Sequence, residues 1–143
     1  MPSHRAAGLV AGLLWLASLW LPAISLAARH ADMDLQAFEQ NGWWLLTAGW
    51  VGIFSGQPAW LANLLVIGLV PTLLMGKQPP WWVSLACAAL SLLSLALPGT
   101  TIHFDGGPYR VVAFDIGYWL WLLAAQIPAL LMLTELNVRR RAK

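Results

Sequence analysis

The stretch that decides the fold is Gly42–Met75, GWWLLTAGWVGIFSGQPAWLANLLVIGLVPTLLM, which holds no charged residue over its 34 positions. One straight helix of this length would extend about 50 Å, well beyond a bilayer core of about 30 Å. Ser55-Gly56-Gln57-Pro58 interrupts it, because proline lacks a backbone N–H and is disfavoured inside helices. The part before the break, 42–54, predicts an interfacial or re-entrant helix, and the part after it, 58–75, has the length of a membrane span.

Three more uncharged stretches have the length of a span, and together with 58–75 they dominate the chain. Overall, 59% of the 143 residues are apolar and 10% are charged, against about 25% charged in soluble domains. The first of these stretches, 8–28, also resembles a secretory signal, because Ser25-Leu26-Ala27 is similar to a cleavage site. Its apolar run is nevertheless long for a secretory signal. The sequence therefore predicts an all-α membrane protein, one domain over 1–143, with four transmembrane helices at 8–28, 58–75, 81–98 and 116–135.

The two remaining segments, 29–41 and 99–115, are predicted as outer loops. In the second, Ile102 and Phe104 alternate with polar residues and are followed by the turn sequence Asp105-Gly106-Gly107-Pro108. Such alternation around a turn is typical of a β-hairpin. We therefore expect a small outer cap, with a hairpin, above the four-helix bundle.

Basic residues concentrate on one side of this topology. That side carries six basic residues and one acidic residue, whereas the other carries two basic and five acidic residues. Positive residues near spans favour the cytoplasm, so both termini are expected there. The run Arg139-Arg140-Arg141 fits orientation and lipid contact rather than nucleic-acid binding. The expected partners are the lipid bilayer and a membrane protein or a second copy of the chain, with no nucleic acid.

Few side chains in the predicted spans could carry chemistry. The single cysteine, Cys87, cannot form an internal disulfide and is expected to be a packing residue. The polar candidates are Asn63 and Gln126, which most simply hydrogen-bond to neighbouring helices. An alternative is that both hold the polar head of a lipid-like or quinone-like ligand, together with Trp60 and Trp50.

The metal-type ligands gather outside the predicted spans. His30, Asp32 and Asp34 alternate along the first outer loop, and His103 and Asp105 alternate along the second. On strands, alternate residues share a face, so the two sets could converge on a divalent cation. Ordinary solvated loop polarity explains the same residues, and a metal-dependent activity is therefore the last of the hypotheses.

Three short motifs carry a resemblance to a known group of proteins. They are Gly49-Trp50-Val51-Gly52, Ala59-Trp60-Leu61-Ala62-Asn63 and Gly117-Tyr118-Trp119-Leu120-Trp121. Together they resemble small uncharacterised bacterial membrane proteins with a glycine-tryptophan segment, an Ala-Trp-x-Ala-Asn span start and a Gly-Tyr-x-Leu-Trp final span. The resemblance implies a bacterial inner-membrane location, four spans and an architectural role for Trp60 and Asn63. It implies no activity.

Three hypotheses about function follow. The favoured one is a non-catalytic protein without a cofactor, acting as an accessory or interaction subunit of a membrane assembly. The alternative is a binder of an apolar, lipid-like or quinone-like ligand between the second span, the fourth span and the 42–54 helix. The third is a metal-dependent activity at His30 and His103.

Overall fold

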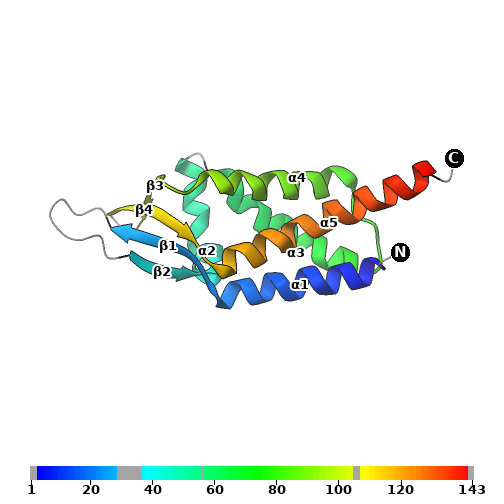
Figure 1. Ribbon diagram of the computed structural model, residues 1–143, viewed down its shortest axis with the longest axis horizontal. Coiled ribbons are helices and arrows are strands. Elements are labelled where there is room, and N and C mark those ends of the chain that lie inside the picture. The colour runs from blue at the N-terminus through cyan, green and yellow to red at the C-terminus, as the bar shows by residue number, and fades with distance from the viewer. Residues whose placement is uncertain (1–2, 29–36, 56, 105–106, 142–143) are drawn as a thin grey trace.

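The computed structural model describes residues 3–28, 37–55, 57–104 and 107–141. In it, four long helices lie side by side, a small sheet lies at one end of them, and both chain termini lie at the other end (Figure 1). The α-helices are α1 (His4–Trp20), α2 (Gly42–Ala48), α3 (Leu61–Leu74), α4 (Trp81–Leu93) and α5 (Ile116–Arg141). Three short 3-10 helices are η1 (Gly49–Ser55), η2 (Pro58–Trp60) and η3 (Ser94–Ala96).

The sheet has four antiparallel strands in the order β2-β1-β4-β3. Their bounds are β1 (Pro22–Ala28), β2 (Ala37–Asn41), β3 (Thr101–Phe104) and β4 (Gly107–Phe114). Strand β1 is central, since Leu26 pairs with Phe38 on one side and with Val111 on the other. The two central strands therefore continue directly from α1 and into α5, which ties the sheet to the helices.

The prediction of a four-helix transmembrane bundle is wrong. Within the described ranges, one helix is long and apolar enough to cross a membrane, the 23-residue part Ile116–Val138 of α5. Helices α3 and α4 have 14 and 13 residues, or about 21 Å and 20 Å, which is shorter than a bilayer core of about 30 Å. A multi-pass placement that rests on four spans loses that support.

The predicted first span, 8–28, is wrong in its last third, where Pro22–Ala28 forms strand β1. Pro22 cannot donate a helical hydrogen bond, and it pushes Leu21 to extended backbone, as the Leu21 angles of φ −91° and ψ 154° show. Beyond it, Ile24 and Leu26 are buried against the rest of the protein. An apolar run of this length is equally compatible with a buried strand and with the end of a helix.

The segment 42–54 is also not one interfacial helix. Asn41 caps α2 by accepting a hydrogen bond from Trp44 N at 2.9 Å, and the chain tightens into η1 at Gly49. The alternation in 99–115 predicts a hairpin, and β3 and β4 do lie there. They form only half of a sheet whose other half lies at Pro22–Ala28, in the predicted first span, and at Ala37–Asn41, in the predicted loop 29–41.

The core runs continuously from the helices into the sheet. Between the helices, Val66, Leu69, Cys87 and Ala125 form one buried cluster. At the sheet end, a second cluster centres on Tyr118 and Leu122, and a third on Ile24, Leu26 and Val111. Leu45 and Phe114 pack against both of these, so the two clusters at the sheet end are joined.

Two glycines let backbones meet at the end of α1. A Cβ atom on Gly42 would collide with the carbonyl oxygen of Ser18, and one on Gly117 would lie 2.7 Å from the carbonyl oxygen of Pro22. Both obstacles are backbone atoms, which cannot move aside as a flexible side chain would. The starts of α2 and α5 can therefore rest against this segment only with glycine at these two positions.

We expect Gly42→Ala to lower the free energy of unfolding by about 2 kcal/mol or more, because the added methyl group overpacks a backbone contact. Thermal unfolding followed by circular dichroism measures this. The matched control is Gly68→Ala in α3, where a Cβ atom would meet nothing within 4 Å. This control should be neutral or stabilising by about 0.5–1 kcal/mol, since alanine is the better helix former. Equal effects of the two substitutions would contradict the packing argument.

Candidate functional site

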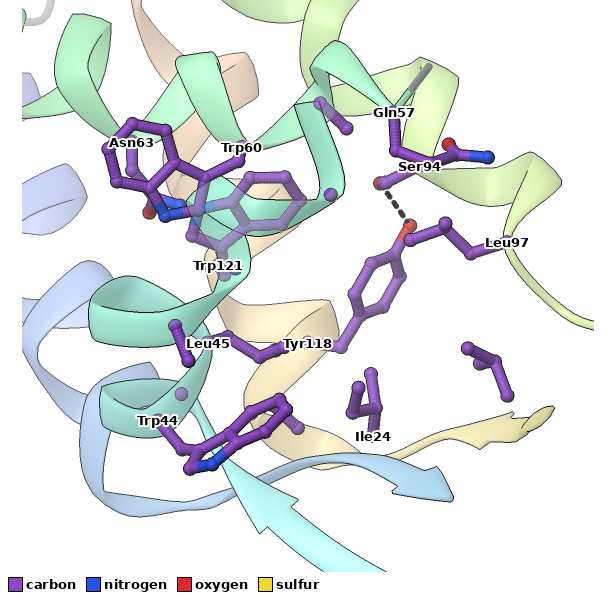
Figure 2. Close-up of a pocket in the computed structure, with 18 of the residues that line it drawn as sticks. Ile24, Trp44, Leu45, Gln57, Trp60, Asn63, Ser94, Leu97, Tyr118 and Trp121 are labelled. Atoms are coloured by element: carbon purple, nitrogen blue, oxygen red, sulfur yellow. Dashed lines mark hydrogen bonds between the residues drawn. The ribbon is translucent and has the colours of Figure 1, made fainter. Parts of the chain in front are cut away.

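A cavity of about 140 Å³ lies at the junction of the helices and the sheet. Its walls come from the end of α1, strands β1, β3 and β4, the segment α2–η1–η2, η3 with Leu97, and the ends of α3 and α5 that face the sheet. Figure 2 shows Asn63, Trp60 and Trp121 together on one side, Ser94, Gln57 and Leu97 on another, and Ile24 and Trp44 toward the sheet. The cavity is thus formed by segments from the whole length of the chain.

The lining is mostly apolar. Strands contribute Ile24, Ile102 and Val111, and the α2–η1 segment contributes Leu45 and Val51. Among the described lining residues there is no carboxylate, imidazole, thiol, ammonium or guanidinium group. The polar character of the cavity therefore comes from a few amides, indoles and hydroxyls.

Among these polar groups, Asn63 is held in place by two hydrogen bonds from other helices. It is 8% exposed, and its Oδ1 accepts hydrogen bonds from Trp121 Nε1 at 2.8 Å and from Trp15 Nε1 at 3.4 Å. An indole N–H can only donate, so two indoles on the same atom fix that atom as the oxygen. One amide oxygen thereby joins α1, α3 and α5 at the edge of the cavity.

Trp60 holds the α2–η1 wall in place. Its Nε1 donates to the Leu46 carbonyl oxygen at 3.0 Å, across the break between α2 and η2. Its ring lies against Gly49, where a Cβ atom would come 2.8 Å from Trp60 Cδ1. The glycine that begins η1 therefore makes room for the tryptophan, and the tryptophan in turn binds the wall to the start of α3.

A pair of hydroxyl groups lies on another side of the cavity. Ser94 Oγ donates to the Ser91 carbonyl oxygen and lies 2.8 Å from the Tyr118 hydroxyl. Because the carbonyl uses the only Ser94 proton, the Tyr118 hydroxyl is the donor in the second bond. The Tyr118 ring stacks on Phe114 with centroids 3.7 Å apart. The tyrosine oxygen keeps only acceptor capacity.

The structure separates the four residues predicted to bind a ligand. Asn63 and Trp60 line the cavity. Gln126 does not line it; its Nε2 donates to Ser91 Oγ at 2.8 Å and links α5 to α4. Trp50 is 47% exposed on the outer side of η1, where it contacts Phe54 edge to face with centroids 6.1 Å apart. The ligand role of these residues remains a prediction.

The predicted metal ligands cannot be placed together. His30, Asp32, Asp34 and Asp105 lie outside the described residues, as does the side chain of His103. In the part of the chain that the structure describes, no three His, Cys, Asp or Glu side chains gather into a group that could hold a metal ion. The metal hypothesis therefore gains nothing from the fold.

Two residues of the cavity lining, Tyr118 and Ser94, and Trp15 beside it could not be assigned from the sequence. Trp15 reaches Asn63 across 48 positions of sequence, and no local pattern announces such a contact. Tyr118 looks like an interfacial anchor because it precedes Trp119 and Trp121, and Ser94 looks like part of a packing stripe. The cavity is lined by residues of α3, α5 and the α2–η1 segment, and also by the sheet, the end of α1 and η3.

Comparison with known proteins identifies no relative of this chain. No family model, no curated protein and no solved structure matches it. The likeness to small bacterial membrane proteins thus stays a resemblance of short motifs.

We expect Asn63→Leu to lower the free energy of unfolding by about 1–3 kcal/mol, because it leaves two indole N–H groups without an acceptor. Trp121→Phe removes one of those donors. In the double variant the losses should be less than additive, with a coupling of about 0.5–1.5 kcal/mol in thermal unfolding.

The control for this cycle is Trp119→Phe, which removes an indole from the same helix. Within the described residues Trp119 makes ring contacts with Phe114 and Tyr118 and no hydrogen bond. It should show no coupling to Asn63→Leu. Strict additivity for Trp121→Phe would mean that the Asn63 contacts contribute nothing.

Proposed function

We propose that this protein is a non-catalytic binding protein whose cavity at the helix–sheet junction takes the apolar ring or short chain of a small ligand. The supporting observation is the cavity itself, of about 140 Å³, apolar and bordered by a few fixed polar groups. An apolar cavity of about 150 Å³ stays free of water and accommodates benzene, which sets the size of the group that fits. Apolar concave sites with a few convergent polar groups are the usual form of ligand sites.

Binding is better supported than turnover because of the groups that face the cavity. Acid–base and nucleophilic catalysis need a side chain that exchanges protons near neutral pH or is activated by one that does. The described lining offers only amides, indoles and hydroxyls. Such groups orient a ligand without transforming it.

We also propose that the Ile116–Val138 part of α5 crosses a lipid membrane and anchors the protein there. Large apolar side chains are exposed on all four long helices, and exposed apolar patches mark contact with protein or membrane. They include Leu9, Leu13, Leu16 and Trp20 on α1, Leu64 and Ile67 on α3, Trp81, Trp82 and Leu85 on α4, and Leu123, Leu130 and Leu133 on α5. Hydrocarbon chains are the medium that such a surface fits.

Charge orients this placement. Arg5 at the start of α1, Lys77 in the turn after α3 and Arg140 at the end of α5 belong to the end of the helices where the termini lie (Figure 1). At the same end, Gln78 Nε2 donates a hydrogen bond to Glu135 on α5 at 2.8 Å. Positive residues favour the cytoplasmic face. We therefore assign the end of α5 that carries Arg140 to the cytoplasm, and the motif resemblance suggests a bacterial inner membrane.

A second candidate function is an accessory subunit that packs against another membrane protein. Its specific support is α1, where Leu9, Leu13, Leu16 and Trp20 form one exposed stripe at helical spacing, with Trp20 82% exposed. Purification in mild detergent separates the candidates. A stoichiometric protein partner would favour the subunit, whereas a lone chain that carries a small apolar molecule would favour the ligand binder.

The cavity proposal predicts that benzene binds at the junction. In purified protein in deuterated detergent, bound benzene should give nuclear Overhauser contacts to the methyl groups of Ile24 and Val111, which line the cavity. Ala48→Leu and Ala59→Leu fill the cavity and should each abolish these contacts. Ala89→Leu adds the same atoms at an exposed position of α4 and should leave them intact. Absence of the contacts in the unmodified protein would refute the proposal.

The membrane proposal predicts a position-dependent cost of charge. Leu130 on α5 is 58% exposed, and Val112 on β4 is 52% exposed. Leu130→Arg should reduce membrane integration by about 2.5–3.5 kcal/mol, because it places a cation near the middle of the crossing segment. Val112→Arg, outside the membrane, should have no such effect. The fraction retained in membranes after alkaline extraction measures both, and equal retention would count against the placement.

A further inference from the structure

The Asn63 amide holds a pair of hydrogen-bond donors at the edge of the cavity. Because both indoles bind its Oδ1, the NH₂ group must project in the other direction. In the described part of the chain, no group accepts a hydrogen bond from Asn63 Nδ2. The side chain is nonetheless more than nine-tenths buried and lines the cavity. The NH₂ group is therefore available to donate to a ligand that enters the cavity, and it defines what that ligand must bring.

The neighbouring donors are already used. Trp60 Nε1 donates to Leu46 O, Ser94 Oγ donates to Ser91 O, and the Tyr118 hydroxyl donates to Ser94 Oγ. Gln57 carries the other amide of the lining and is only half-buried, on a different side of the cavity (Figure 2). Asn63 is therefore the place where a deeply bound acceptor gains most.

The acceptor must be uncharged. A carboxylate or phosphate would need a cation to offset its loss of water, and no cationic side chain is among the described lining residues. A hydroxyl group is a poorer fit than a carbonyl, because it brings a proton of its own while the adjacent Asn63 Oδ1 already accepts two bonds. A carbonyl oxygen accepts without donating and suits the NH₂ group.

We propose that the Asn63 amide receives the carbonyl oxygen of a neutral ketone or quinone whose ring occupies this cavity, an inference that rests on the proposed ligand-binding function. The cavity volume fits a single six-membered ring. The apolar walls from the sheet and from α2–η1 enclose the ring, and any further substituent extends out of the cavity. Asn63 is thus the residue that selects carbonyl compounds among molecules of this size.

Two isosteric probes test this in the unmodified protein. Cyclohexanone and methylenecyclohexane have nearly the same shape and differ in whether the exocyclic atom accepts a hydrogen bond. Both should give nuclear Overhauser contacts to Ile24 and Val111. Only cyclohexanone should move the resonances of the Asn63 side-chain amide protons in a spectrum of nitrogen-labelled protein.

Asn63→Asp supplies the second arm of the test. It keeps an acceptor for both indoles and replaces the NH₂ group by an oxygen, so cyclohexanone affinity should fall about five- to tenfold. Methylenecyclohexane affinity should change less than about twofold, since that probe makes no hydrogen bond. Gln40→Glu, the same chemical change on β2 away from the cavity, should alter neither. If Asn63→Asp fails to fold, the amide resonances of the unmodified protein decide alone.

The outcomes separate the two proposals. If both probes bind but neither moves the Asn63 amide protons, and Asn63→Asp affects them equally, the cavity binds apolar groups and the carbonyl inference is overturned. Amide protons that contact only water in the presence of cyclohexanone overturn it as well. If neither probe binds, the proposed function falls with it.

Discussion

The end of α1 is the segment on which the rest of the structure depends. Pro22 turns the chain from helix into strand, and the carbonyl groups from Ser18 to Pro22 then support the starts of α2 and α5. Gly42 N donates to Leu21 O at 3.2 Å, and Asp115 N donates to Ala23 O at 2.9 Å. Ser25 Oγ adds a bond to Asp115 Oδ2 at 2.9 Å. Three segments that are far apart in sequence are fixed here at contact distance.

The cavity is a consequence of this junction. The four long helices pack side by side, and the sheet meets them at the end of α1 (Figure 1). A helix bundle has a ridged surface whereas a sheet has a broader face, so the two surfaces do not fill all the space between them. The α2–η1–η2 segment closes one side of the resulting space, held by the Trp60 bond to Leu46 O. The polar atoms that face the interior are mostly paired with the chain itself, which keeps the space apolar. Among the described lining residues, the Asn63 NH₂ group and the half-buried Gln57 side chain make no hydrogen bond to the chain.

Several boundaries between elements can be predicted from the sequence, whereas the type of element between those boundaries cannot. Asn41-Gly42 and Ser55–Pro58 mark real boundaries, because capping and proline effects are local. The predicted span 8–28 is wrong because apolarity does not distinguish a buried strand from a helix, and β1 is buried by partners that come much later in the chain. Likewise, α3 covers only Leu61–Leu74 of the predicted span 58–75, because the chain begins there with η2, and α4 ends at Leu93, where the chain tightens into η3.

In the candidate site, too, residues marked by the local sequence could be predicted, whereas residues defined by long-range contacts could not. Trp60 and Asn63 stand out as polar or interfacial residues at the start of an apolar helix, and both line the cavity. Gln126 has the same sequence character but lies between α4 and α5, because its position on the helix turns it toward Ser91. Trp15 and Tyr118 could not be assigned, since their roles exist only once α1 and α5 meet. A role that depends on a contact across 48 residues leaves no trace in local spacing.

The walls of the cavity also differ in how readily they yield. The sheet wall is held by strand pairing on both sides of β1, while the opposite wall is a run of 3-10 turns in which η1 covers seven residues, longer than such helices usually are. Segments with weaker backbone bonding open locally at a smaller free-energy cost than the elements around them. The η1 wall is therefore expected to open locally more readily than the sheet wall.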